Sequence, residues 1–340
     1  MSAVTSVPEG KPFATRSGVR KLVAAAVAAP SVHNTQPWRF CRVNDATMDL
    51  YADLERLLAV TDPLGRGLGI SCGAALFNLR LAIRMTEHNP QVLPLPDPGD
   101  RPDLLATVHA RPGGPPDADE RLLYDMIPHR RTNRFPFDGR PLPRDVVVDL
   151  VAAAHDEGAT LALVKGRTAQ RVLDLVAMAD STLADDESYR AELARWTRPG
   201  TCSDGVPKDA FGPRPRHREL PMRDFGLSDA RRTYDVPGET ADFEADPQLA
   251  ALFTRGDGPR DWLRAGQALQ RVLLTATAHG VAASMFSQPL DLRPPQHRGD
   301  RAEPFGHVQM LMRFGYGPLV PRVPRRPVFE VLDRCGARHA

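Results

Sequence analysis

The sequence of 340 residues predicts an α+β fold that contains two copies of one structural unit. The pattern Val-x-x-Leu-Val-Ala-Ala-Ala occurs at 19–26 and again at 147–154, and Gly-x-Ala-Leu occurs at 73–76 and again at 266–269. The two matches come in the same order, and each is followed by a segment with the composition of a β-strand. One match between alanine-rich helices would be explained by chance, but two ordered matches favour an internal duplication.

The first copy, residues 1–115, is expected to contain two helices and at least three strands. The first helix begins at its cap Ser17 and ends before Pro30, because proline disfavours the helical conformation in the residue that precedes it. The other elements of this copy are expected as strands at 38–43 and 48–52, a helix at 70–87, a Pro/Asp/Gly-rich linker at 89–102 and a strand at 104–110.

The second copy, residues 116–340, repeats this order and contains an insertion of about 65 residues. Its expected elements are a helix around 147–154, a strand at 161–164, a helix over 168–196, a helix around 266–274 and a strand at 308–314. Residues 197–238 of the insertion are rich in proline, glycine, arginine and aspartate and show no clean periodicity. Because structureless segments of this length are uncommon in compact domains, we expect a lid or a disordered surface loop.

The composition restricts the class of protein. Hydrophobic residues make up 42% and charged residues 25%, as in an ordinary globular protein, and the net charge of +2 does not favour nucleic-acid binding. No apolar run reaches the roughly 20 residues of a membrane helix. The four cysteines are scattered without metal-ligand spacing, so we expect reduced thiols in a cytoplasmic protein with no metal site.

Polar side chains on a turn between two prolines form the first candidate site. The segment 29–40 joins the first helix to the first strand and carries Ser31, Asn34 and Gln36. Hydroxyl and amide groups of this kind can bind the polar edge of a flat heteroaromatic ring such as isoalloxazine. A capped helix–strand connection with Trp38 in the core explains the same residues equally well.

Two clusters of arginine are candidate phosphate sites. The segment 129–135 carries three arginines with a threonine hydroxyl among them, which suits a phosphate monoester. The segment 322–327, just after the last expected strand, carries three more arginines. Solvated basic turns would also explain both clusters.

Together these segments resemble the nitroreductase family of FMN proteins. Residues 30–38 match the family's P-S-x-x-N-x-Q-P-W loop. Residues 130–137 are close to its R-R-S-V-R-x-F segment, with Thr132 and Asn133 in place of serine and valine, and 325–327 is similar to its C-terminal basic-Pro element. The long two-copy form with its insertion looks most like the Acg branch of the family.

The resemblance implies the nitroreductase fold, a mixed and mainly antiparallel sheet flanked by helices, with FMN as cofactor. Family subunits each carry the arginine segment and the loop and combine them in a dimer. Here the loop lies only in the first copy and the full arginine segment only in the second. This arrangement implies one FMN per chain and a monomeric pseudo-dimer, although further dimerisation stays open.

The resemblance also assigns cofactor contacts residue by residue. Residues 280–285 resemble the segment whose backbone lines the flavin, but Ser287-Gln288 stands where the family often has Glu-Gly, so contacts near the flavin N5 are expected to differ. The residues implied to bind FMN are Pro30, Ser31, Val32, Asn34, Gln36, Arg130, Thr132, Arg134, Met285, Ser287, Arg325 and Arg326.

Two functions follow from the resemblance. The first is an NAD(P)H-dependent oxidoreductase for nitroaromatic, quinone or similar small aromatic acceptors, in which the flavin supplies the redox chemistry and no catalytic side chain is required. The second is a non-catalytic FMN storage protein of the Acg type, whose insertion closes the flavin site. In that insertion, Arg214, Arg216, His217 and Arg218 are expected to reach anionic groups near the cofactor. Neither function predicts a nucleic-acid or membrane partner.

Overall fold

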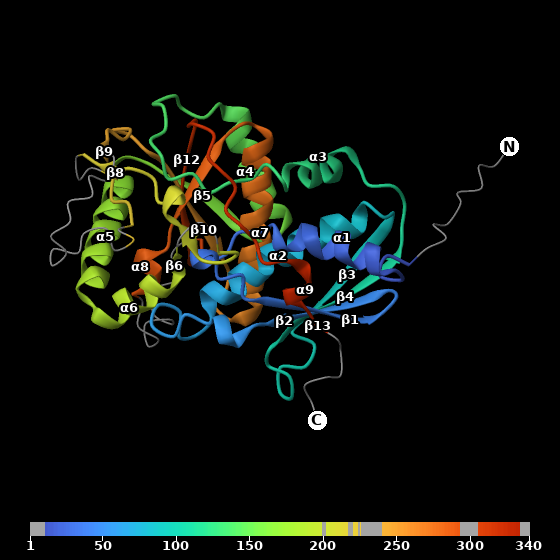
Figure 1. The fold of residues 1–340 in the computed structure, drawn as a ribbon. Helices are drawn as coiled ribbons and strands as arrows, with labels where there is room; N and C mark the ends of the chain where they lie inside the picture. Colours follow the sequence, from blue (N-terminus) through green and yellow to red (C-terminus); the bar gives the residue numbers. More distant parts are fainter. Residues whose placement is uncertain are drawn as a thin grey trace.

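Two sheets with matching strand order form the framework of the chain (Figure 1). The computed structural model describes residues 11–198, 202–216, 220–223, 225, 240–292 and 305–333. In each sheet, four strands follow this matching order, and neighbouring strands among the four are antiparallel. The order in the first sheet is β1 (Trp38–Asn44), β2 (Thr47–Ala52), β4 (Leu104–Pro112), β3 (His88–Pro94), and in the second it is β5 (Thr160–Val164), β10 (Gln248–Thr254), β12 (His307–Gly315), β11 (Ala282–Phe286).

The last described segment of the chain returns from the second sheet to the first. The short strand β13 (Leu332–Asp333) pairs in parallel with β1, and Cys41 lies opposite Asp333. The connection from β12 to β13 includes the basic tail and helix α9 (Val328–Val331). The tail of the second unit is therefore placed beside the loop that precedes β1.

Two long helices, α2 (Arg66–Arg84) and α7 (Pro259–Ala278), pack against each other in the middle of the molecule. Helix α2 is buried on all sides except at Arg80 and Arg84, as expected for a helix surrounded by protein. The helices touch at Gly73 and Gly266. A methyl group on Gly266 would lie 2.0 Å from the Ile70 carbonyl oxygen and 2.8 Å from the Gly73 Cα, so no larger residue fits without a shift of the backbone.

Helices cover both faces of the second sheet. Ala250 and Leu252 of β10 pack with α4 and α7, whereas Leu249 and Ala251 pack with α5, so the strand is apolar on both faces. On the first sheet, α1 and α2 cover one face. The helices that cover the sheets include α1 (Arg16–Val27), α4 (Arg144–Asp156) and α5 (Gly166–Asp185). The chain also contains α3 (Ala118–Met126), α6 (Glu187–Trp196) and α8 (Gln288–Asp291).

The irregular segment 197–238 is referred to below as the insertion, and its described part packs against α5 and α6. Val206, Phe211 and Phe225 form one apolar cluster with Tyr189 and Leu193 of α6, which anchors the segment. This packing is not that of a disordered surface loop. The short elements here are β6 (Thr197–Arg198) paired with β7 (Val206–Pro207), the 3₁₀ turn Lys208–Ala210, and β8 (Arg214–Pro215) paired with β9 (Thr240–Ala241).

Most elements expected from the sequence are present, but three predictions were wrong. Thr15, not Ser17, caps α1, because its hydroxyl accepts from Gly18 N at 3.0 Å. The expected linker at 89–102 begins with strand β3. Among the described strands it lies at the edge of its sheet, where prolines cost little because one side of the strand pairs with no other strand described. The helix expected over 168–196 is two helices, since Asp186 caps α6 through Ser188 N.

The cysteines also differ from the expectation of four reduced thiols. Cys41 is disulfide-bonded, whereas Cys72 and Cys202 are free. Cys41 lies where β13 joins β1, so residues distant in sequence meet there. Spacing along the chain could not predict that meeting.

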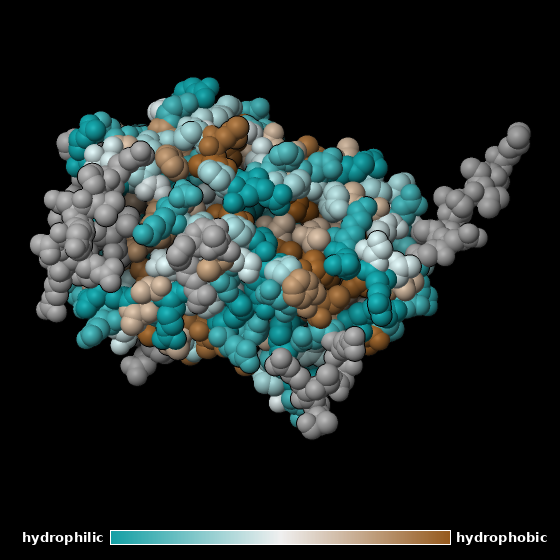
Figure 2. Space-filling model, viewed as in Figure 1, coloured by the Kyte–Doolittle hydropathy of each residue, from teal (hydrophilic) through white to brown (hydrophobic). Residues whose placement is uncertain are grey.

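The surface provides little further information about the class of protein. Figure 2 shows a mostly hydrophilic face, with apolar side chains gathered near its middle, in the region of α1 and α9 in Figure 1. Phe329 of α9 is 72% exposed. Within the part of the chain that the structure describes, no helix is long and apolar enough to cross a membrane.

Candidate functional site

The loop between α1 and β1 has a rare backbone conformation that its own side chains hold in place. His33, Asn34 and Gln36 have φ values of 47°, 55° and 51°, in the left-handed region that residues other than glycine seldom adopt. Ser31 Oγ accepts from Gln36 N at 2.9 Å, and Ser71 Oγ of α2 accepts from the loop backbone at 3.2 Å. Such strain persists only where the surroundings fix it, which is common at binding sites.

Two amide side chains of this loop bind the insertion. Asn34 Nδ2 donates to the Gly205 carbonyl at 2.9 Å, and Gln36 Nε2 donates to the Ser203 carbonyl at 2.8 Å. The fully buried Gln36 also accepts from Arg326 N at 2.8 Å. The loop, the insertion and the tail are thus tied together by the same side chains.

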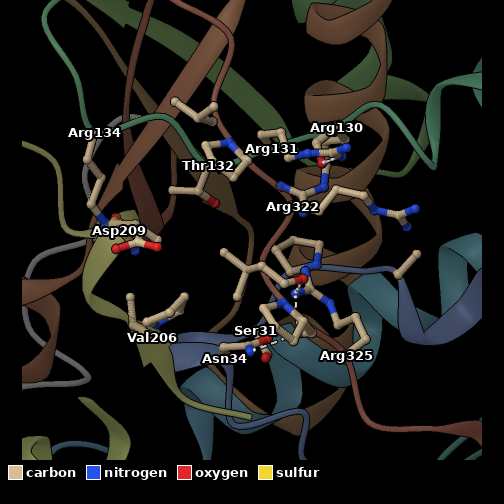
Figure 3. Close-up of a pocket in the computed structure, with 18 of the residues that line it drawn as sticks. Ser31, Asn34, Arg130, Arg131, Thr132, Arg134, Val206, Asp209, Arg322 and Arg325 are labelled. Carbon is tan, nitrogen blue, oxygen red and sulfur yellow. Dashed lines mark hydrogen bonds between the residues drawn. The ribbon is translucent and has the colours of Figure 1, made fainter. Parts of the chain in front are cut away.

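A first cavity lies between the loop, the arginine segment, the insertion and the tail (Figure 3). It encloses about 1100 Å³, including space open to solvent. Figure 3 shows Arg130, Arg131 and Arg322 together on one side with Arg325 below them. Arg134 lies on the opposite side, next to Asp209, the only acidic residue among the described residues of the lining.

The arginine wall is buried and short of partners. Arg130 is 5% exposed, and its Nε and Nη1 atoms have no hydrogen-bond partner among the described residues. Burial, and then the charges of Arg325 and Arg131, lower the pKa of Arg130 to about 9. Burial also lowers the pKa of Arg325 and of Arg134 to about 10. Buried cationic donors without partners are costly, so this wall indicates an anionic ligand.

A second cavity of about 750 Å³ continues from the first. The two share Pro30, Ser31, Thr132 and Arg134, so they are parts of one site. The rest of the second lining is mainly apolar and comes from α2, α7, β11, β12 and the insertion. A charged cavity joined to an apolar one suits a ligand with an anionic end and a flat apolar body.

One arginine of the insertion reaches the far side of the second cavity. Arg223 donates to Ser287 Oγ at 2.8 Å, to Asp291 Oδ2 at 2.9 Å and to the Tyr189 hydroxyl at 2.5 Å. Burial lowers the pKa of Arg223, but Tyr189 and Asp291 outweigh this effect, and the pKa is raised overall. Unlike Arg130, this arginine has its charge balanced locally.

An aromatic ring of the insertion packs against His33, which lines the second cavity. Phe225 lies edge-on to His33, with ring centroids 6.4 Å apart, and stacks on Phe211 at 4.6 Å. Burial, then Arg223 and Arg134, lower the pKa of His33 well below its usual value. His33 is therefore a neutral imidazole at pH 7, able to donate or accept one hydrogen bond.

Comparison with known proteins identifies the family. The chain is 35% identical to the "Putative NAD(P)H nitroreductase Rv3131" of Mycobacterium tuberculosis over 332 residues, covering 94% of this chain and 92% of the relative. It is 30% identical to the "Putative NAD(P)H nitroreductase acg" of the same organism, covering 93% and 96%. The chain belongs to the nitroreductase family. No protein-family model matches it.

Solved nitroreductases align with about two thirds of the chain at low similarity. One from Bacteroides fragilis with bound FMN is 14% identical with a TM-score of 0.34, covering 63% of this chain and 96% of that one. The FMN-dependent NfnB from Mycobacterium smegmatis in complex with NADPH is 17% identical with a TM-score of 0.34, covering 62% and 96%.

Most residues that the nitroreductase resemblance named line the two cavities. These are Pro30, Ser31, Val32, Asn34, Arg130, Thr132, Arg134, Met285, Ser287 and Arg325. Gln36 and Arg326 do not line either cavity. Gln36 holds the insertion and the tail, and Arg326 is bound to Asp53 and Glu330, each at 3.4 Å. Of the two tail arginines that the resemblance named, Arg325 lines the first cavity and Arg326 does not.

The insertion contributes residues that the nitroreductase motifs could not reveal. Arg223, Phe225 and Asp209 line the cavities, yet no pattern distinguishes them from neighbouring residues of the same type. Arg214 and Arg216, expected near the cofactor, do not line either cavity, and Arg216 pairs with Asp242 at 2.7 Å. His217 and Arg218, expected there too, lie outside the described residues.

Proposed function

We propose that this chain binds one FMN across the two cavities and acts as an NAD(P)H-dependent oxidoreductase. The observation that carries the proposal is the buried guanidinium of Arg130, with two unpaired nitrogens on a wall that also holds Arg325. A phosphate monoester, with a charge of about −1.5 to −2, would supply the missing acceptors. The mainly apolar second cavity suits a flat aromatic ring system.

Each predicted contact has a distinct task in this proposal. Arg130 and Arg325 would hold the phosphate, and the Thr132 hydroxyl would serve the ribityl chain. The residues of the second cavity would hold the ring, with Ser287 and the end of β11 along one side. FMN supplies hydride and one-electron transfer when bound, while the protein positions it and excludes water. His33 offers a neutral hydrogen-bonding group in the second cavity.

The site would be built from both copies of an internal duplication, residues 1–115 and 116–340. The loop comes from the first copy and the arginine segment from the second. Gly73 and Gly266, which occupy matched positions of the repeat, touch each other as equivalent residues do across a twofold dimer interface. The shared site and the contact between the two glycines favour a monomer as the functional unit.

The first prediction concerns cofactor and turnover. The purified monomer is expected to be yellow and to release about one FMN per chain on heating, identified by chromatography. With NADPH or NADH and a nitrofuran or quinone, it is expected to oxidise the nucleotide. Release of FAD, or of two FMN per chain, would contradict the proposed site. Cell fractionation would test the predicted cytoplasmic location.

A storage function is the second candidate, and the insertion favours it. Backbone carbonyls of the insertion accept from Asn34, Gln36 and Arg134, and Arg223 ties the same segment to Asp291. The segment thus closes over loop and cavity alike, which would restrict access of a nicotinamide or an acceptor. FMN held in this way would be retained rather than turned over.

A pair of variants distinguishes the two functions. Arg223→Gln removes the ion pair with Asp291 and is expected to let the insertion open, so that iodide quenches bound FMN severalfold faster and NADPH reduces it severalfold faster. Arg216→Gln is the matched control, since its exposed pair with Asp242 lies on the same segment away from the cavities. Equal rates in Arg223→Gln and the parent protein would count against a closing role for the insertion.

A further inference from the structure

The arginine wall of the first cavity has more charge than one phosphate requires. Arg130, Arg131, Arg322 and Arg325 lie on this wall. Burial, and then the charge of a neighbouring arginine, lower the pKa of Arg130, Arg131 and Arg325. Asp209, the one acidic residue that the described part of the chain contributes to the lining, lies across the cavity beside Arg134. A phosphate monoester contributes about −1.5 to −2. About two cationic charges on the wall are therefore left without an anion.

Burial divides the wall into an inner and an outer pair. Arg130 is buried, and Arg325 is fixed by hydrogen bonds to the Ala29 and Val323 carbonyls. Arg322 is exposed and makes no hydrogen bond or ion pair within the part of the chain that the structure describes. Arg131 is partly exposed, and its Nη1 donates to the Pro128 and Arg130 carbonyls.

The outer pair is held ready for an anion. The two carbonyl contacts fix the guanidinium plane of Arg131, which leaves its other nitrogens for a ligand. Guanidinium forks match the oxygens of phosphate, and a pre-oriented fork loses less freedom when it binds. Arg322 would complete the pair from the tail, on the same side of the cavity.

We propose that Arg131 and Arg322 form a second phosphate site, which binds the 2′-phosphate of NADPH. The inference rests on the proposed function, because that function requires a pyridine nucleotide beside the flavin. The 2′-phosphate is the group that distinguishes NADPH from NADH. It is a dianionic phosphate monoester, which is the kind of anionic ligand that the outer pair of arginines would bind. The site therefore makes NADPH the preferred reductant.

The test uses FMN-loaded protein and two nucleotides that differ only in this group. The flavin content is fixed first by absorbance, and binding of 2′,5′-ADP and of 5′-AMP is then measured by calorimetry at low salt. We expect 2′,5′-ADP to bind at least tenfold more tightly, and its affinity to fall at least tenfold in Arg131→Gln and in Arg322→Gln. Arg322→Lys is expected to keep part of the affinity, and added salt to weaken binding. Arg171→Gln, an exposed arginine on α5, is the control.

Three outcomes would overturn the assignment. Equal binding of the two nucleotides would show that the 2′-phosphate is not recognised. Unchanged 2′,5′-ADP binding in both variants would place its site elsewhere. Loss of FMN from the same variants would assign the outer pair to the flavin phosphate. Failure of the proposed function is distinct, since it appears beforehand as a protein without FMN.

Discussion

Replacing Gly266 with alanine is expected to destabilise the protein by about 3 kcal/mol, the upper part of the range for overpacked cores. The added methyl group would lie 2.0 Å from the Ile70 carbonyl oxygen and 2.8 Å from the Gly73 Cα. Both are backbone atoms of a buried helix, so no side chain can rotate away. The helices α2 and α7 would have to move apart along their shared interface. Denaturant unfolding of the FMN-free protein measures the change.

Glycines elsewhere in the chain provide the control. Gly139→Ala is expected to change the unfolding free energy by less than about 0.5 kcal/mol, because no atom lies within 4 Å of the new methyl group. Gly73→Ala is expected to act like Gly266→Ala, since its methyl group would lie 2.2 Å from the Leu263 carbonyl oxygen. The double variant Gly73→Ala/Gly266→Ala should lose less unfolding free energy than the sum of the two single variants, because the first substitution already separates the helices. A stability of Gly266→Ala equal to that of Gly139→Ala would contradict the tight crossing.

The damage should also reach the cofactor site. Ile70 and Ala74 of α2 and Leu269 of α7 line the second cavity, close to the crossing. Separation of the helices would therefore change the shape of that cavity, and FMN should bind more weakly in Gly266→Ala. This coupling explains why a contact between two glycines matters for a site that neither residue lines.

Regular patterns in the sequence were sufficient for the framework. The strands expected at 38–43, 104–110 and 308–314 are confirmed as β1, β4 and β12, because apolar residues in short runs between turn signals depend little on distant contacts. The match between 73–76 and 266–269 was visible, but its cause, the contact between the two helices, was not. Strand β3 was missed because its prolines suggested a linker, and only its edge position makes them harmless.

The candidate site was predictable where a contiguous motif carries it. Loop 30–38 and segment 130–137 supplied most of the predicted residues that line the cavities, since each acts within a few residues of its own sequence. Contacts between residues that are far apart in the sequence could not be predicted. Arg223 pairs with Asp291 across 68 positions, and Gln36 binds Arg326 across 290. Gln36 illustrates the limit: the motif located it in the loop beside the cavities, but its amide is occupied by protein partners in the interior.

The guanidinium of Arg130 is expected to destabilise the FMN-free protein and to stabilise the FMN complex. It is buried beside Arg325 and Arg131, and its Nε and Nη1 have no hydrogen-bond partner among the described residues. Burial, and then the charges of these arginines, lower its pKa to about 9. Arg130→Met keeps much of the volume and removes the charge. We therefore expect the FMN-free variant to be more stable by about 1 kcal/mol or more, because replacing poorly compensated buried charge by an apolar chain is often stabilising.

The same substitution should weaken FMN binding tenfold to a hundredfold, since a hydrogen bond to a charged group contributes about 1.5–3 kcal/mol. Riboflavin lacks the phosphate, so its affinity should change far less, and Arg171→Gln should affect neither ligand. Titration by fluorescence quenching and unfolding of the FMN-free protein give the two readouts. A stability gained together with an affinity lost is typical of a binding residue that is held in an unfavourable state until its ligand arrives. A variant that is less stable yet binds FMN normally would instead make Arg130 a structural residue and leave the phosphate site without its central donor.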